Sequence, residues 1–322
     1  MVLPKTEQAN GMGSKDRKPR DFRGSYIRWW HAAMGHPGDA TAIRMIEQGL
    51  GKINGVEITK KMYNRHAPWC ETCAKGKCRR NSHKARENAS EGWPDRPNMI
   101  HSFDSTGKMI RSMWGHRYST IIKDHHDGRP WAYSHSRKTG DVWRRLLAHH
   151  EHAAMIDGRL SKVFHQHGGI HDLRVMAYRC DNETNFPEEL ERRRRQGIGS
   201  EFTVPRDGHG QQNAVAERAI GQTRQLADIL INSKMHSIPL RQARRLWPYA
   251  HRHAAHLQLL WPTRHNEGSM SPGKKRYAAG KGSNNKKWQA RLLPRDPWSR
   301  ANRKDPMDTD GQVPMDVRGC ES

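Results

Sequence analysis

The order of apolar patterns along the chain predicts an α/β fold, in which helices flank a mixed five-stranded sheet. Short apolar runs alternate with stretches of helical period between residues 99 and 262. A segment with paired histidines and cysteines precedes that block, and both ends of the chain are basic without apolar periodicity. The expected parts are a disordered basic arm (1–24), a small helical domain (25–80), a linker (81–98), the α/β core (99–262) and a largely disordered C-terminal extension (263–322).

Five short apolar runs predict the strands of the sheet. They cover residues 99–103, 118–122, 131–133, 173–178 and 202–204. Asp127-Gly128 lies between the second and third runs and is typical of a hairpin turn, so these two strands are expected to be antiparallel.

Helical periodicity separates and follows these runs. The strongest helix prediction covers 212–234, where Val215, Ala219, Leu226 and Ile229 share one face. Further helices are expected at 141–156, 187–196 and 240–260, and a shorter one at 41–46 after a Pro-Gly-Asp start signal.

Composition limits the class of protein. Only 46 of 322 residues are Leu, Ile, Val or Phe and the net charge is +24, so a packed core is expected only where a pattern is present. No apolar run approaches the roughly 18 residues of a membrane span, and the first residues do not resemble a signal peptide. Five cysteines in a chain of this length make a reducing compartment more probable than a disulfide framework. The charge favours a polyanionic partner but does not separate DNA from RNA or an anionic membrane.

Two histidines and two cysteines predict a structural zinc site. His31 and His36 are five residues apart, and Cys70 and Cys73 have the spacing that lets one tight turn direct both sulfurs at one ion. Two nitrogens and two sulfurs complete a closed tetrahedron, and the metal supplies folding energy that a short segment lacks. With 21 histidines in the chain, the His pair alone is weak evidence.

Other ligands compete for this site. Cys78 is an alternative fourth ligand, although Lys77 and Arg79 beside it favour a spare thiol, and the spacing of His66 fits less well.

Three carboxylates predict a second metal site. Asp104 and Asp181 each end an apolar run, and Glu217 lies in the first turns of the 212–234 helix, after a gap of 35 residues. Carboxylates from two strand ends and one helix can hold two divalent ions at a phosphodiester. Ordinary solvated caps remain the alternative. Asp124 also ends a strand, but the turn at Asp127 makes it a hairpin shoulder, so Asp124→Asn is expected to leave activity nearly unchanged.

These motifs resemble a known family. His31-Ala-Ala-Met-Gly-His36-Pro37 with Cys70-Glu-Thr-Cys73 looks like the pre-integrase zinc segment of Ty1/copia-type retrotransposon polyproteins. The segments around Asp104, around Asp181-Asn182 and over 205–218 resemble the integrase core of the same family, and 247–277 resembles the segment that follows it. The resemblance covers about residues 26–280. It departs from the family at Glu183, Thr184, Asn185 and Ala214.

The resemblance implies an RNase H-like integrase core with structural Zn²⁺ and two catalytic Mg²⁺ or Mn²⁺ ions. By position, His31, His36, Cys70 and Cys73 would bind zinc, and Asp104, Asp181 and Glu217 the catalytic ions. The implied activity is DNA 3′-end processing followed by strand transfer to target DNA, by a nuclear homo-oligomer without a membrane partner. The alternatives are an inactive, transposon-derived remnant that binds zinc and nucleic acid, and an RNase H-like nuclease that cuts without joining.

Basic side chains near these carboxylates are expected to contact DNA phosphates rather than bases. The candidates are Lys108, Lys123, Arg206, Arg218 and Arg224. The run Arg192–Arg195 is interpreted as a solvated helix face near DNA.

Overall fold

The structure is a computed structural model. It describes residues 22–53, 56–67, 70–76, 94, 96–160, 174–181, 187–203, 213–233, 238–263, 266 and 270–277. All of them belong to one compact unit that spans residues 21–283. Most of the predicted basic arm and the chain beyond 277 lie outside the described residues. Among the helices that are described, none is at once long and apolar enough to cross a membrane.

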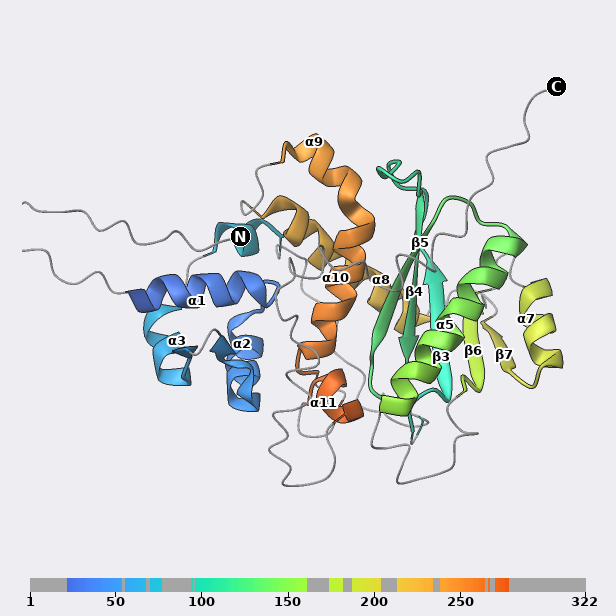
Figure 1. The fold of residues 1–322 in the computed structure, drawn as a ribbon, viewed down its shortest axis with the longest axis horizontal. Coiled ribbons are helices and arrows are strands. Elements are labelled where there is room, and N and C mark those ends of the chain that lie inside the picture. Colours follow the sequence, from blue (N-terminus) through green and yellow to red (C-terminus); the bar gives the residue numbers. More distant parts are fainter. Residues whose placement is uncertain are drawn as a thin grey trace, which may run out of the picture. The chain divides into compact units, whose positions relative to one another are not determined.

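The predicted mixed five-stranded sheet with flanking helices is confirmed. Its strands are β3 (Ile100–Ser105), β4 (Tyr118–Asp124), β5 (Pro130–His135), β6 (Ala177–Asp181) and β7 (Gly199–Thr203). The strand order is β5-β4-β3-β6-β7 (Figure 1). Strands β3, β4 and β5 form an antiparallel meander, and β6 and β7 continue the sheet parallel to β3.

One face of the sheet packs on α5 (Gly140–Leu160) and α7 (Pro187–Arg195). The inward residues of neighbouring strands meet the apolar face of α5, which explains its helical period. This core contains Phe103, Ile122, Trp143, Leu146, Leu147, Tyr178, Cys180 and Leu190. It is aromatic-rich, and Phe103 and Tyr178 meet edge to face at 5.7 Å. A few large rings thus supply the buried area that the scarce aliphatic residues cannot.

The opposite face carries α8 (Ala214–Asn232) and α10 (Trp247–Leu260), which pack against each other and on β3, β4 and β5 (Figure 1). The predicted helix over 240–260 is interrupted: α9 (Leu240–Ala243) passes through a 3₁₀ turn, Arg244–Leu246, into α10. Pro248 in the first turn of α10 explains the break, because proline cannot donate the backbone hydrogen bond that a continuous helix needs.

The N-terminal segment is helical and has a core of its own. It contains α1 (Phe22–Ala33), α2 (Asp39–Met45), a π-helical turn (Ile46–Leu50), α3 (Lys60–His66) and α4 (Glu71–Gly76), with a short hairpin of β1 (Lys52–Ile53) and β2 (Val56–Glu57). Trp30 is fully buried, and its indole N–H donates to the carbonyl of Leu50 over 2.9 Å. The sequence suggested that a metal ion supplies the folding energy that this segment lacks. The structure shows that the segment also has an apolar core of its own.

The fourth strand differs from the prediction. Residues 174–176 precede the strand, which begins at Ala177 and ends at Asp181. Backbone hydrogen bonds from Met176 to Asn98 and from Ala177 to Met99 bring this segment alongside the start of β3. The apolar run alone could not fix this boundary because Val175 is buried although it lies outside the strand.

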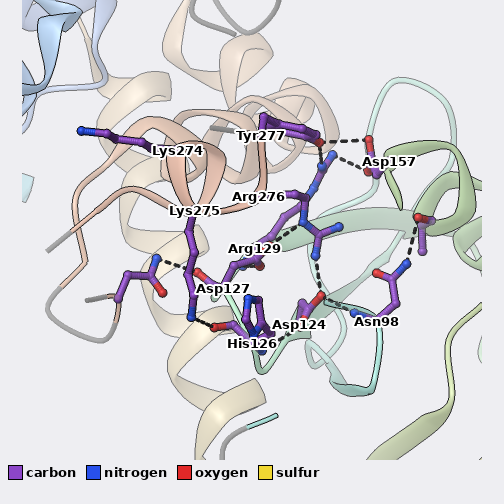
Figure 2. Close-up of polar contacts among 12 residues, drawn as sticks. Asn98, Asp124, His126, Asp127, Arg129, Asp157, Lys274, Lys275, Arg276 and Tyr277 are labelled. Carbon is purple, nitrogen blue, oxygen red and sulfur yellow. Dashed lines mark hydrogen bonds and ion pairs between the residues drawn. The ribbon is translucent and has the colours of Figure 1, made fainter. Parts of the chain in front are cut away.

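A short C-terminal helix, α11 (Pro272–Tyr277), is fastened to the β4–β5 hairpin (Figure 2). The buried Arg276 guanidinium forms ion pairs with Asp124 and Asp127, and Lys275 donates to the His126 carbonyl over 2.6 Å. Arg129 pairs with Asp157 at 2.6 Å and contacts Tyr277. The predicted extension from 263 therefore begins with an ordered, packed element.

Buried histidines line both faces of the sheet. His101 and His150 approach to 2.7 Å, and Tyr133 lies 3.0 Å from the other nitrogen of His150. Across the sheet, His125 lies 2.5 Å from the Ser102 hydroxyl, and His251 of α10 lies 3.0 Å from that of Ser119. Burial lowers the pKa of His150 well below its ordinary value, and lowers those of His125 and His251 to about 4.

These histidines predict a loss of stability in mild acid. Between about pH 6.5 and 4 the unfolded chain binds protons that the folded chain does not, so the free energy of unfolding falls as the pH falls. We expect the free energy of unfolding to fall by up to about 1.4 kcal/mol per pH unit for each such histidine, and the thermal unfolding midpoint to decrease accordingly from pH 7.5 to 5. His251→Asn keeps a polar side chain near the Ser119 hydroxyl and should make the pH dependence of stability shallower. His152→Asn, at an exposed position of α5, should leave that dependence unchanged. An equal pH dependence of the unfolding midpoint in both variants would mean that His251 is not one of the responsible histidines.

Candidate functional site: a His/Cys cluster and three carboxylates

The end of α1 places the two predicted histidine ligands. Gly35 has a φ of +74° and His36 a φ of +58°, so the chain turns back on the helix instead of continuing it. The amide of His36 donates to the carbonyl of His31 over 2.8 Å. This reversal brings the two imidazole rings to a centroid distance of 5.0 Å at right angles.

The two cysteines approach these rings from the start of α4: Cys70 directly precedes the helix and Cys73 lies within it. Cys73 Sγ lies 3.1 Å from His31 Nε2, and Cys70 Sγ lies 3.3 Å from His36 Nδ1. All four donor atoms lie within 4.8 Å of one another, and both imidazoles are buried. Tetrahedral zinc with these ligands separates sulfur and nitrogen by roughly 3.5 Å. The cluster can therefore bind a zinc ion.

The alternative ligands are placed differently. His66 ends α3 and does not belong to the group of four donor atoms. Cys78 lies outside the described residues.

The His/Cys segment packs on the helices that cover the sheet. The Trp261 indole donates to the Met34 carbonyl over 2.9 Å, directly before the turn that holds His36. The left-handed φ of Gly35 favours glycine, and a Cβ there would lie 2.5 Å from a terminal methyl group of Leu257 in α10. A metal ion bound at His31 and His36 would hold this turn in place, and with it the surface that packs on α10.

Cys73→Ser is expected to lose bound zinc and to loosen the N-terminal segment. Removal of one thiolate leaves three ligands, and zinc binding to such a segment contributes directly to its folding. Metal analysis of the purified chain should give one zinc for the wild type and for Cys78→Ser, but little for Cys73→Ser. Zinc loss in Cys78→Ser, with retention in Cys73→Ser, would mean that the ligand assignment is wrong.

Two of the three predicted carboxylates lie near the ends of neighbouring parallel strands. The pairing of β3 with β6 runs from Ile100–Ala177 to Ser102–Arg179, and Asp104 and Asp181 each follow two residues after the last pair. Side chains two residues apart share a sheet face. Phe103 and Cys180 point into the core beneath α5, so Asp104 and Asp181 belong to the opposite face, which α8 covers.

The third carboxylate comes from the first turn of α8. Asn213, directly before this helix, donates from its side chain to the carbonyl of Phe103 over 3.2 Å. That contact holds the start of α8 at the strand residue next to Asp104. Glu217 is exposed in the first turn, and its amide donates to the Asn213 carbonyl.

The donor atoms of the His/Cys cluster gather in one place, whereas the three carboxylates do not. Among the described residues, the His/Cys cluster is the one group of three or more such side chains gathered closely enough to hold a metal ion. Asp104, Asp181 and Glu217 share a face and an edge of the sheet, without forming such a group. The amide of Ser105 donates to Asp104 over 2.6 Å.

Cations surround the carboxylate face. Burial, together with the Arg218 guanidinium of α8, lowers the pKa of the half-buried Lys123 to about 8. Arg179 lies on the same face and pairs with Glu201 at 2.6 Å. Lys108 and Arg224 are exposed, and Arg206 lies outside the described residues.

Two sequence interpretations need correction. Asp124 is fully buried: although burial raises its pKa, Arg276 and His101 hold it well below the usual value, so Asp124 anchors α11 and is no passive hairpin shoulder. The arginine run of α7 is not a uniformly solvated face either. Arg193 is buried and pairs with Glu189 at 3.0 Å and with Glu151.

Comparison with known proteins gives little beyond this geometry. No family model and no curated protein matches the chain. Among solved structures it is similar to the simian T-cell lymphotropic virus intasome in complex with PP2A regulatory subunit B56 gamma. That match covers 80% of this chain and 73% of the other, with a TM-score of 0.45 and 14% identity. At this level of similarity the match assigns neither a family nor a function to the chain.

Proposed function

We propose that the chain is a metal-dependent polynucleotidyl transferase of the retrotransposon integrase type, which processes and joins DNA ends. The proposal is supported mainly by the sheet topology: Asp104 and Asp181 belong to the adjacent parallel strands β3 and β6, and Glu217 lies in the first turn of α8, which packs on β3. An antiparallel meander followed by two parallel strands is also the sheet expected of the RNase H-like core that the sequence resembles.

The three carboxylates are not gathered into a metal-binding group in the structure, but their chemical type suits divalent ions of the proposed kind. Neighbouring strands are about 4.8 Å apart, which allows aspartates on adjacent strands to share a ligand ion. Carboxylate oxygens are the ligands that Mg²⁺ and Mn²⁺ prefer. When bound, such ions activate the attacking oxygen and stabilise the leaving oxygen of a phosphodiester.

The chain's own groups would position the substrate. Lys123, Arg179 and Arg218 lie on or beside the carboxylate face, where they can meet phosphates without reading the base sequence. Asn213 would keep the first turn of α8 against β3. The His/Cys cluster lies outside the chemistry and would stabilise the N-terminal segment against α10.

A strand-transfer assay tests the proposal. The full chain is incubated with Mn²⁺, the terminal DNA of its own element and a supercoiled target plasmid, and joined products are separated from cut products. Joining supports the proposal, cutting without joining favours the nuclease, and inactivity with correct ends favours the remnant. Oligomeric assembly on DNA and a nuclear location are further predictions of the same proposal.

A further inference from the structure

An exposed aromatic surface lies where the β3–β4 loop meets the start of α10. Trp114 and Tyr249 are 48% and 55% exposed, and their rings meet at 4.6 Å with an angle of 67°. Ile110 and Met113 beside them are 54% and 57% exposed. We call these four residues the aromatic patch. Its two rings are 135 residues apart in the sequence, so no local pattern predicts it.

The patch is held in a fixed geometry. The buried Ser112 hydroxyl accepts the amides of Trp114, at 3.2 Å, and His116, at 2.9 Å, and so closes the loop tip. The Trp247 indole donates to the Ile110 carbonyl over 2.9 Å, and the Met113 amide donates to the Arg245 carbonyl over 3.2 Å. Two elements thus hold the exposed rings in place before any partner binds, which reduces the entropy cost of binding.

The surroundings of the patch are basic. Residues 106–117 contain Lys108, Arg111 and Arg117, and residues 238–256 contain four arginines; neither segment contains an aspartate or a glutamate. Asp228 of α8 interacts with Arg244 and offsets one of these charges. A large positive excess therefore remains around the exposed rings.

We infer that the aromatic patch binds unpaired bases of single-stranded nucleic acid, while the neighbouring arginines contact its phosphates. Exposed aromatic rings in a basic setting are the combination that single strands require, because every base has a face that can stack. A second copy of the chain would bring the same positive charge to the interface, and this repulsion disfavours self-association through the patch. An acidic protein would match the positive charge around the patch, but its binding would not require exposed aromatic rings.

The position of the patch connects it to the carboxylate face. The loop that carries Trp114 begins after Ser105, one residue beyond Asp104, and the first hydrogen bonds of the loop continue the β3–β4 pairing. Unpaired nucleotides beside a processed DNA end would thus have a stacking surface on the loop that leaves the strand of Asp104. The inference rests on the proposed function only in taking nucleic acid as the partner, and it is tested without catalysis.

Binding of fluorescein-labelled oligothymidylate and of a duplex of equal length is measured by fluorescence anisotropy. The full zinc-loaded chain is used without Mg²⁺ or Mn²⁺. Trp114→Ala should weaken oligothymidylate binding about fivefold or more, and duplex binding much less. Trp114→Phe should bind nearly as the wild type does, whereas Trp114→Leu, which keeps an apolar group without a ring, should be as weak as alanine. Circular dichroism should show that each variant is folded.

Trp29→Ala is the matched control, since Trp29 is an exposed tryptophan (37%) on α1, outside the patch. It should bind oligothymidylate as the wild type does. Equal losses in Trp29→Ala and Trp114→Ala, or full binding by Trp114→Leu, would overturn the inference. So would competition by poly-glutamate as effective as that by unlabelled oligothymidylate, because charge alone would then account for binding. A wild type that joins no DNA yet binds oligothymidylate through Trp114 would refute strand transfer and support this inference.

Discussion

Glu217→Gln is expected to reduce strand transfer by about 100-fold or more while leaving duplex affinity equal or slightly higher. The change keeps the size and helix propensity of the side chain but removes one negative charge from the set that would hold two ions. Affinity should not fall, because the lost carboxylate repels phosphates. Joining rates with Mn²⁺ and anisotropy with labelled duplex measure the two effects separately.

Glu188→Gln is the matched control for this experiment. Glu188 is also an exposed glutamate in the first turn of a helix, but in α7, on the far side of the sheet. It should retain wild-type joining. If Glu217→Gln and Glu188→Gln are equally active, Glu217 is not part of the catalytic set. Asp124→Asn cannot serve as the control that the sequence suggested, because it removes a buried ion pair.

Arg276→Met is expected to lower the free energy of unfolding by about 3–5 kcal/mol. Arg276 is fully buried and pairs with both Asp124 and Asp127, which are buried as well. Methionine fills much of the space but leaves two buried carboxylates without their cation, and that penalty exceeds the lost attraction. Urea unfolding followed by tryptophan fluorescence measures the change.

Lys274→Met tests whether the effect is specific to the buried guanidinium. Lys274 lies two residues earlier on the same short helix and is half-buried. It should change the free energy of unfolding by less than about 0.5 kcal/mol. A similar loss in both variants would show that α11 tolerates no substitution, and would remove the evidence for a special role of Arg276.

Local patterns were sufficient to predict most elements of the sheet and its helices. The period of Ala219, Leu226 and Ile229 defines α8, and all three residues are buried in it. The spacing within His31–His36 and within Cys70–Cys73 identified two halves of a cluster that the fold then joins. Each of these features lies within one element or one turn, where side-chain period and spacing carry the information.

Features that depend on distant contacts could not be predicted in this way. Arg276 looks like any surface cation in a basic stretch, and only its meeting with Asp124, 152 residues earlier, explains its burial. Trp114 and Tyr249 give no local signal either, because neither belongs to an apolar period. The placement of Asp104 and Asp181 on adjacent strands depends on which strand becomes the neighbour of β3, and residue spacing does not determine that.

The contact between Arg276 and the β4–β5 hairpin has a consequence for synthesis of the protein on the ribosome. Asp124 and Asp127 leave the ribosome about 150 residues before Arg276 does, so until then the partners of these carboxylates among the described residues are His101 and backbone amides. Bringing such distant partners together is slow compared with forming hairpins and helices. The hairpin therefore completes its buried ion pairs only after α11 has emerged, and we expect a nascent chain that stalls before residue 276 to be more exposed to aggregation and proteolysis than the full chain.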